Sequence, residues 1–321
     1  MKPARSRPAP LAPACRAGRR FAADTNWWRP IPFISAACLW LALGAGCSTF
    51  RLGTATAEPA DKPAKAPLLT APSKHPYRVS QFVFLADFEV KIDQPLFREL
   101  GDLPDQVFKE LQLSPSNTVI QVYLFEDRDK YERFMQARYP ELPKRRAFFV
   151  AQPRSVGGGE DLLVYTFWGE RIREDLRHEL THALLHSVLR DVPLWLDEGL
   201  AEYFELPPDS HGMNPGHLEQ LRTPDRDSFK ASLMRLEELS QVQQMAPAEY
   251  REAWAWIHLM LRGKPEAKLV LTGYLQQLRT NPNPGPLRPR LVSVFPELND
   301  ALYQHLIELE RTAHSVPTAQ R

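Results

Sequence analysis

The order of secondary-structure patterns along the chain is the strongest constraint on its fold. Residues 77–168 contain strand-like segments rich in β-branched and aromatic residues, and every strong pattern from residue 170 onward is helical. Strands followed by helices predict an α+β fold, with a small N-terminal sheet subdomain (about 77–168) and a helical subdomain (about 169–315). We expect strands over 79–88, 118–125, 146–151 and 162–168, and helices over 95–113, 127–139, 170–190, 194–205, 229–240, 247–262, 265–280 and 296–312.

Two of the expected helices carry more detailed predictions. Gly101 and Pro104 lie within 95–113, so we expect a break in that helix. Asp127 stands directly before the apolar pattern of 127–139, where its side chain can cap the first turn.

The N-terminus has the layout of a secretory signal peptide. Residues 1–30 hold seven basic side chains and one acidic side chain, and residues 31–46 are uncharged. This uncharged run is shorter than the roughly 20 residues of a membrane-spanning helix. Its ending, LGAGC at 43–47, resembles a bacterial lipoprotein processing site, which implies removal of residues 1–46 and lipidation of Cys47. An uncleaved N-terminal anchor is the alternative.

Cysteine usage and charge are consistent with an exported body. Cys15, Cys38 and Cys47 all lie at or before the expected processing site, so the body would have no disulfide, thiol nucleophile or cysteine ligand. Residues 47–76 are rich in proline and alanine and read as a tether. Beyond residue 46 the chain has 33 basic and 38 acidic residues, which disfavours a nucleic-acid partner. We predict a protein that is exported and lipid-anchored to the bacterial cell envelope.

The sequence His178-Glu179-Leu180-Thr181-His182 is the strongest chemical motif. On a helix, residues four apart project from one face, so His178 and His182 could bind one Zn²⁺. Glu179 would lie close enough to take a proton from a water molecule on that Zn²⁺. An ordinary charged helix remains the alternative for these five residues alone.

A second motif strengthens the zinc interpretation. Residues 195–205 read WLDEGLAEYFE, and 15 residues separate His182 from Glu198. Together the two motifs resemble those of the gluzincin metallopeptidases, and more closely those of compact peptidase-like domains of exported bacterial proteins. The resemblance implies a zincin-like domain over 77–315, with His178, His182 and Glu198 as ligands of one Zn²⁺ per chain and Glu179 as general base. The chain departs from the family pattern at Asp197, where asparagine is usual, and in its shorter gap between the motifs.

Neighbouring acidic and histidine residues leave alternatives open. Glu202 lies four residues after Glu198, so it could accept a hydrogen bond from a ligand histidine or replace Glu198 as ligand. We expect Glu205 to be a solvated charge off that helical face. We expect His186 to pack or cap near its helix end, and the histidines at 211 and 217 to be solvated in a loop.

Two tyrosines are candidates for the rest of the site. Gluzincins use a tyrosine or histidine on a later helix to stabilise the oxyanion, and Tyr250 fits that place by resemblance. A core tyrosine is its alternative. Tyr165 lies on the expected strand 162–168, which by the same resemblance would line the cleft and pair with an extended substrate. We expect Tyr165 itself to be a sheet residue.

The sequence therefore predicts an exported zinc-dependent hydrolase, and a peptidase by resemblance. Its partners would be a peptide or protein substrate and, through Cys47, a membrane. The alternative is a non-catalytic, zinc-stabilised binding or assembly module of the cell envelope. Glu179 favours the enzyme, because a structural metal site has no need of a carboxylate beside the attacking water.

Overall fold

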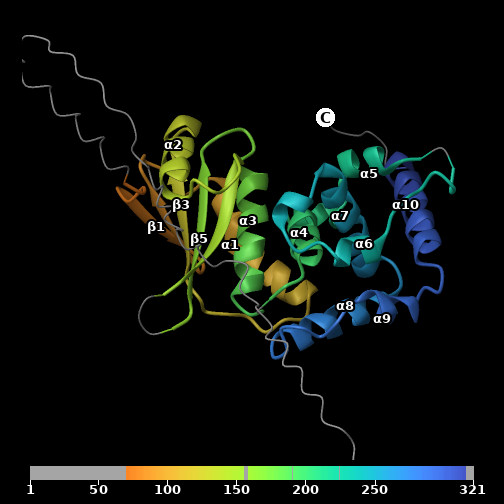
Figure 1. Ribbon diagram of the computed structural model, residues 1–321. Coiled ribbons are helices and arrows are strands. Elements are labelled where there is room, and N and C mark those ends of the chain that lie inside the picture. Colours follow the sequence, from red (N-terminus) through yellow and green to blue (C-terminus); the bar gives the residue numbers. More distant parts are fainter. Residues whose placement is uncertain (1–69, 155–157, 190, 224, 316–321) are drawn as a thin grey trace, which may run out of the picture. The chain divides into compact units, whose positions relative to one another are not determined.

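The computed structural model describes residues 70–154, 158–189, 191–223 and 225–315, all within one compact unit, Lys65–Arg321 (Figure 1). The expected signal peptide, Cys47 and residues 47–69 of the expected tether lie outside the described residues. The first strand begins at His75, inside the last residues assigned to the tether. No helix in the described part of the chain is both long enough and apolar enough to cross a bilayer.

The sheet has five strands in the order β1-β2-β3-β5-β4. The three inner strands run parallel, and β1 and β4 pair antiparallel at the two edges. This sheet, combined with helices, confirms the expected α+β class. The strands are β1 (His75–Val79), β2 (Phe82–Ala86), β3 (Ile120–Phe125), β4 (Ala147–Pro153) and β5 (Glu160–Phe167).

The strand expected over 79–88 is confirmed only for the part that forms β2, because residues 79–82 form the hairpin turn that joins β1 to β2. Val79 pairs with Phe82, and Ser80 between them has a left-handed φ of 54°. Such a conformation matches the twist of two-residue hairpin turns. Apolar residues stand on both sides of the turn, so the hydrophobic pattern continues where the backbone reverses.

Ten α-helices occur in the described residues: α1 (Pro95–Glu110), α2 (Arg128–Arg138), α3 (Ile172–His186), α4 (Leu194–Phe204), α5 (Pro215–Leu221), α6 (Leu233–Glu237), α7 (Pro247–Arg262), α8 (Pro265–Leu278), α9 (Arg288–Val292) and α10 (Leu298–Ser315). The Asp127 cap is confirmed, since its side chain accepts a hydrogen bond from the Lys130 backbone N–H at 2.8 Å. The break expected in 95–113 is absent. Leu100, Leu103 and Val107 of α1 are fully buried, so packing of this face outweighs the lost Pro104 donor. The helix expected over 229–240 is reduced to α6.

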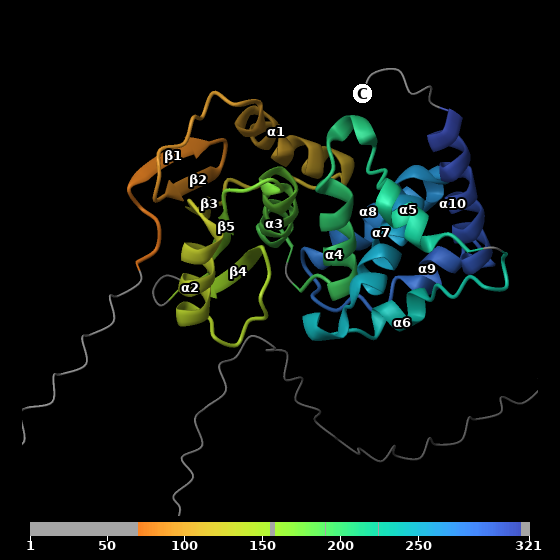
Figure 2. The same cartoon turned by 90° about the horizontal axis from the view of Figure 1, so that it is seen from above.

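Helices cover both faces of the sheet. Helix α2 packs on one face, where Phe134 stacks on Tyr165 of β5, and α1 and α3 pack on the other (Figure 2). Alternating side chains of the strands divide accordingly between two apolar clusters, with Val164 in the cluster of α3 and Tyr165 in the cluster of α2. One side of helix α3 therefore packs against the sheet, and another side contacts α4.

Helices α4 and α7 are packed with their backbones in close contact. A Cβ atom on Gly199 of α4 would lie 2.8 Å from the Ala253 carbonyl oxygen and from Ile257. Helix α4 contacts α3 as well, so it stands between α3 and α7, and α8 and α10 pack against α7. Only glycine at residue 199 lets the two helix backbones come this close. Their contact fixes the position of Glu198, the neighbouring residue on α4.

Two histidines form a buried pair between α7 and α10. The Nδ1 atom of His258 lies 2.9 Å from Nε2 of His305, and both rings are almost inaccessible to solvent. Burial, together with the neighbouring His305 and Arg262, lowers the pKa of His258 to about 3, and burial lowers the pKa of His305 to about 4. Both rings are therefore neutral in the folded protein at neutral pH.

We predict that this pair makes the protein less stable in mild acid. Below about pH 6.5 the two histidines bind protons in the unfolded chain but remain neutral in the folded chain. The free energy of unfolding therefore falls as pH falls. The loss should be roughly 2 kcal/mol per histidine between pH 7 and pH 5. Urea unfolding at both pH values measures it. The His258→Leu/His305→Leu double variant removes both partners together and should show a flatter pH dependence; an equally steep one would contradict the prediction.

Candidate metal centre

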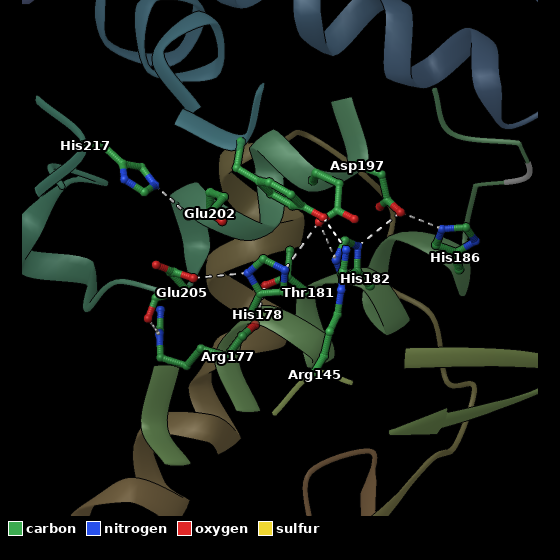
Figure 3. A network of polar contacts seen from close by, with 12 residues as sticks. Arg145, Arg177, His178, Thr181, His182, His186, Asp197, Glu202, Glu205 and His217 are labelled. Carbon is green, nitrogen blue, oxygen red and sulfur yellow. Dashed lines mark hydrogen bonds and ion pairs between the residues drawn. The ribbon is translucent and has the colours of Figure 1, made fainter. Parts of the chain in front are cut away.

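Helices α3 and α4 bring the candidate ligands together from two separate motifs. Leu176, Leu180 and Leu184 bury one side of α3 completely, which turns His178 and His182 toward α4. Figure 3 shows the two imidazoles side by side, with carboxylates from α4 around them.

Three side chains converge closely enough to hold a metal ion. The possible ligand atoms of His178, His182 and Glu198 all lie within 4.8 Å of one another. Oε2 of Glu198 lies 3.5 Å from Nε2 of each imidazole, yet it is buried and forms no hydrogen bond with any described residue. A buried carboxylate oxygen that forms no hydrogen bond and faces two imidazole nitrogens completes a donor set suited to Zn²⁺.

The electrostatics of these groups favour a cation between them. Burial would raise the pKa of Glu198, but the two histidines outweigh it and lower this pKa to about 2. Burial would lower the pKa of His182, but Asp197 and Glu198 outweigh it and raise this pKa to about 10. The pKa of His178 is also raised, by Glu198 and Glu205 against burial. The carboxylates thus stabilise a positive charge between or on the two imidazoles. Protons or a metal ion can supply this charge.

Glu179 is placed differently from the three converging residues. Its carboxylate forms no hydrogen bond or ion pair with the residues that the structure describes. Burial raises the pKa of Glu179, and the two histidines oppose this increase. An unengaged carboxylate with a raised pKa is suited to accept a proton near neutral pH.

Glu205, not Glu202, holds the outer nitrogen of His178. Nδ1 of His178 lies 3.1 Å from Oε2 of Glu205, and Glu202 instead pairs with Nε2 of His217 at 2.7 Å. The expectation that Glu205 leaves this helical face is wrong: seven residues make almost two full turns, so Glu205 returns to the direction of Glu198. The prediction of a solvated His217 is wrong as well, because His217 lies in α5 and is half-buried.

A second group of possible ligands shares His178. The ligand atoms of His178, Glu202 and Glu205 also lie within 4.8 Å of one another. This group excludes His182, whereas Glu198 faces both histidines of the first motif. The geometry therefore favours Glu198 over Glu202 as the carboxylate partner of the histidine pair.

Asp197 hydrogen-bonds to His186 and lies within ion-pair distance of the outer nitrogen of His182, which forms no hydrogen bond with any described residue. Its Oδ2 atom lies 3.1 Å from Nδ1 of His182 and 3.0 Å from Nε2 of His186. His186 therefore packs at the end of α3, as expected, and links to the site through this carboxylate. His211 is exposed, as expected. Carboxylates that orient ligand histidines in this way are typical of zinc sites.

Arg177 fixes the end of α4 and is a residue that the motifs did not indicate. Its guanidinium is almost fully buried and donates to the backbone carbonyls of Glu205 at 3.1 Å and of Leu206 at 2.7 Å. Cations at a helix C-terminus stabilise its free carbonyls. The sequence shows only that Arg177 stands directly before His178. A charged residue at such a position is normally expected to be exposed to solvent.

Tyr250 reaches the site from the first turn of α7. Its hydroxyl accepts a hydrogen bond from Nη2 of Arg145 at 2.8 Å. Burial, together with the negative charge of Glu198, raises the pKa of Tyr250 to about 12. The hydroxyl is thus protonated at neutral pH, and Arg145 is a further site residue that the sequence did not indicate.

Tyr165 is a sheet residue, as expected, but strand β5 does not line the site as the resemblance implied. Tyr165 faces α2 on the opposite side of the sheet, where its hydroxyl lies 3.2 Å from that of Tyr139. Strand β5 is paired on both sides. The edge strand is β4, and Phe149 on it stacks on the ring of His182 with centroids 6.2 Å apart. Its free edge is the one available to an extended chain.

Comparison of the chain with models of known protein families gives no match, and comparison with curated protein sequences gives none. The functional argument therefore rests on the motifs and on the geometry of the described residues.

We predict that Glu205→Gln weakens zinc binding more than Glu202→Gln. Glu205 contacts His178, whereas Glu202 contacts His217, and loss of a carboxylate that orients a ligand histidine typically costs about 10–100-fold in metal affinity. Competition with a chelating dye measures the affinities. Glu202→Gln is the matched control on the same helix; an equal loss in both variants, or no loss in either, would argue against this assignment.

Proposed function

We propose that this protein is an exported zinc-dependent peptidase of the gluzincin type, with one zinc ion held by His178, His182 and Glu198. The observation that carries the proposal is the buried Oε2 of Glu198, which forms no hydrogen bond with any described residue and lies 3.5 Å from both imidazole nitrogens. Asp197 and Glu205 behind the two imidazoles add support, because they would fix the ring orientations that a metal needs.

The fold is compatible with this proposal. A sheet subdomain over about 77–168 and a helical subdomain over about 169–315, which α3 would begin, would together form a zincin-like domain over 77–315. The two motifs then lie on adjacent helices, as the gluzincin resemblance requires. The described residues include both helices completely.

A zinc ion in this site would supply a Lewis acid and lower the pKa of the attacking water. Glu179 takes the proton of that water, since its carboxylate is unengaged and its pKa is raised. Tyr250 donates its hydroxyl hydrogen to the carbonyl oxygen on which negative charge develops, because Arg145 already occupies an acceptor position of this hydroxyl. The free edge of β4 pairs with the backbone of an extended peptide.

The cellular location is part of the proposal. The signal-like N-terminus and the motif before Cys47 support export and lipid anchoring to the bacterial cell envelope, and both lie outside the described residues. The partners are a peptide or protein substrate and the membrane.

We predict that Glu179→Gln retains zinc but loses hydrolysis. Glu179 is not among the converging ligands, and a positioned general base contributes about 10²–10⁴-fold in rate. Elemental analysis and cleavage of a broad peptide library measure the two properties. His182→Ala, as the comparison, should lose stoichiometric zinc. Equal cleavage by Glu179→Gln at full zinc occupancy would contradict the mechanism, and a zinc-loaded parent that cleaves nothing would favour the binding-module alternative.

We predict that Cys47→Ser moves the protein from the membrane fraction to the soluble exported fraction. Serine lacks the thiol that lipidation requires, and stable anchoring needs more than one acyl chain or signal. Fractionation and labelling with a fatty acid measure this change. Undiminished labelling of the variant would show that another residue is modified.

A further inference from the structure

A small cavity lies where α2 and the loop before β4 meet. It measures about 140 Å³, and its walls include Met135, Leu142 and Phe148, with Tyr131 and Arg145 among its polar residues. A buried apolar cavity of about 150 Å³ is large enough for benzene. This cavity therefore has room for one branched or aromatic side chain.

Arg145 connects this cavity to the metal centre. It lines the cavity, its Nη2 donates to Tyr250, and its guanidinium lies 5.8 Å from the centroid of the Tyr250 ring. Figure 3 shows its side chain pointing from the sheet side toward the cluster that contains His182.

The charge of Arg145 is not balanced by a direct partner. No carboxylate among the described residues lies within ion-pair distance of it, whereas the adjacent Arg146 contacts Asp175 at 2.9 Å. Nε and Nη1 of Arg145 likewise have no hydrogen-bond partner in the described part of the chain. A half-buried guanidinium with free N–H groups can bind a carboxylate through two parallel hydrogen bonds.

Tyr131 gives a second, independent indication of a ligand. Its side chain is 1% exposed and lines the cavity, and its hydroxyl forms no hydrogen bond with any described residue. Buried hydroxyls normally have a partner. Burial raises the pKa of Tyr131, and the negative charge of Glu179 adds to this increase.

We propose that this cavity binds the C-terminal residue of a peptide substrate, with an apolar side chain inside it and the terminal carboxylate on Arg145. The inference rests on the proposed function and adds its substrate class: the protein removes apolar C-terminal residues. Water adds its oxygen to the preceding carbonyl carbon, the C–N bond breaks, and a proton passes to the leaving amine. The released amino acid retains the carboxylate that Arg145 bound.

Binding to the uncleaving, zinc-loaded Glu179→Gln full-length chain tests this proposal. The probes are acetyl-Ala-Ala-Leu with a free carboxylate, its C-terminal amide, acetyl-Ala-Ala-Gly with a free carboxylate, and acetyl-Ala-Ala-Asp amide. Calorimetry should show the leucine acid binding at least about tenfold more tightly than its amide, as expected for loss of a charge-assisted contact. It should also bind more tightly than the glycine acid, which leaves the cavity unfilled. The aspartate amide should bind no better than the leucine amide.

Substitutions of arginine assign the effect to Arg145. Adding Arg145→Ala to the Glu179→Gln chain should make the affinities for the leucine acid and the leucine amide about equal. Arg145→Lys should give an intermediate affinity ratio, because lysine cannot bind a carboxylate through two parallel hydrogen bonds. Arg154→Ala is the matched control. Arg154 is half-exposed, lies just beyond the other end of β4 and pairs with Asp161, so its loss should leave the ratio unchanged.

The proposal would be overturned by equal binding of the leucine acid and its amide, by no measurable binding of either, or by an unchanged affinity ratio after Arg145→Ala. Tight binding of the aspartate amide would also overturn it, because the carboxylate would then come from a side chain. A parent that binds zinc and hydrolyses the leucine amide as fast as the acid refutes only this subsite. A parent without zinc and without hydrolysis refutes the proposed function itself.

Discussion

The close contact between α4 and α7 at Gly199 determines where the carboxylate of Glu198 can lie. Any side chain at residue 199 would place its Cβ atom 2.8 Å from a backbone oxygen of α7. The contact presses one side of α4 against α7 and leaves the adjoining side for α3. Glu198 therefore reaches both imidazoles from a helix. Close packing of the α4 and α7 backbones sets its position, and no loop conformation is involved.

The same arrangement concentrates negative charge around two imidazoles. Asp197, Glu198 and Glu205 all contact them, and each has lost much of its hydration. Such a group is stable only when positive charge is held among the carboxylates. Protons and a metal ion compete for that role, so metal retention should depend on pH, since both imidazoles must be unprotonated to act as ligands.

Local signals in the sequence were sufficient for the fold class and most helices, and the resemblance of the two motifs to those of gluzincins added the convergence of His178, His182 and Glu198. They were insufficient where the relevant contact joins distant segments. Arg145 and Tyr250 are 105 residues apart, and no pattern near either one indicates their hydrogen bond. The role of Glu205 could have been predicted, because seven residues return to the same helical face, whereas its anchoring by Arg177 depends on the tertiary packing of α3 against α4.

The free edge of β4 has a consequence for the behaviour of the protein at high concentration. Among the described residues this strand pairs only with β5, so its other side presents unpaired N–H and C=O groups that a second copy of the chain could also join. Two features oppose such aggregation. Arg145 and Arg146 place like charges before the strand, and Pro153 ends it with a residue that has no N–H to donate. The strand thus has charges before its start, a proline at its end and little tendency to self-associate.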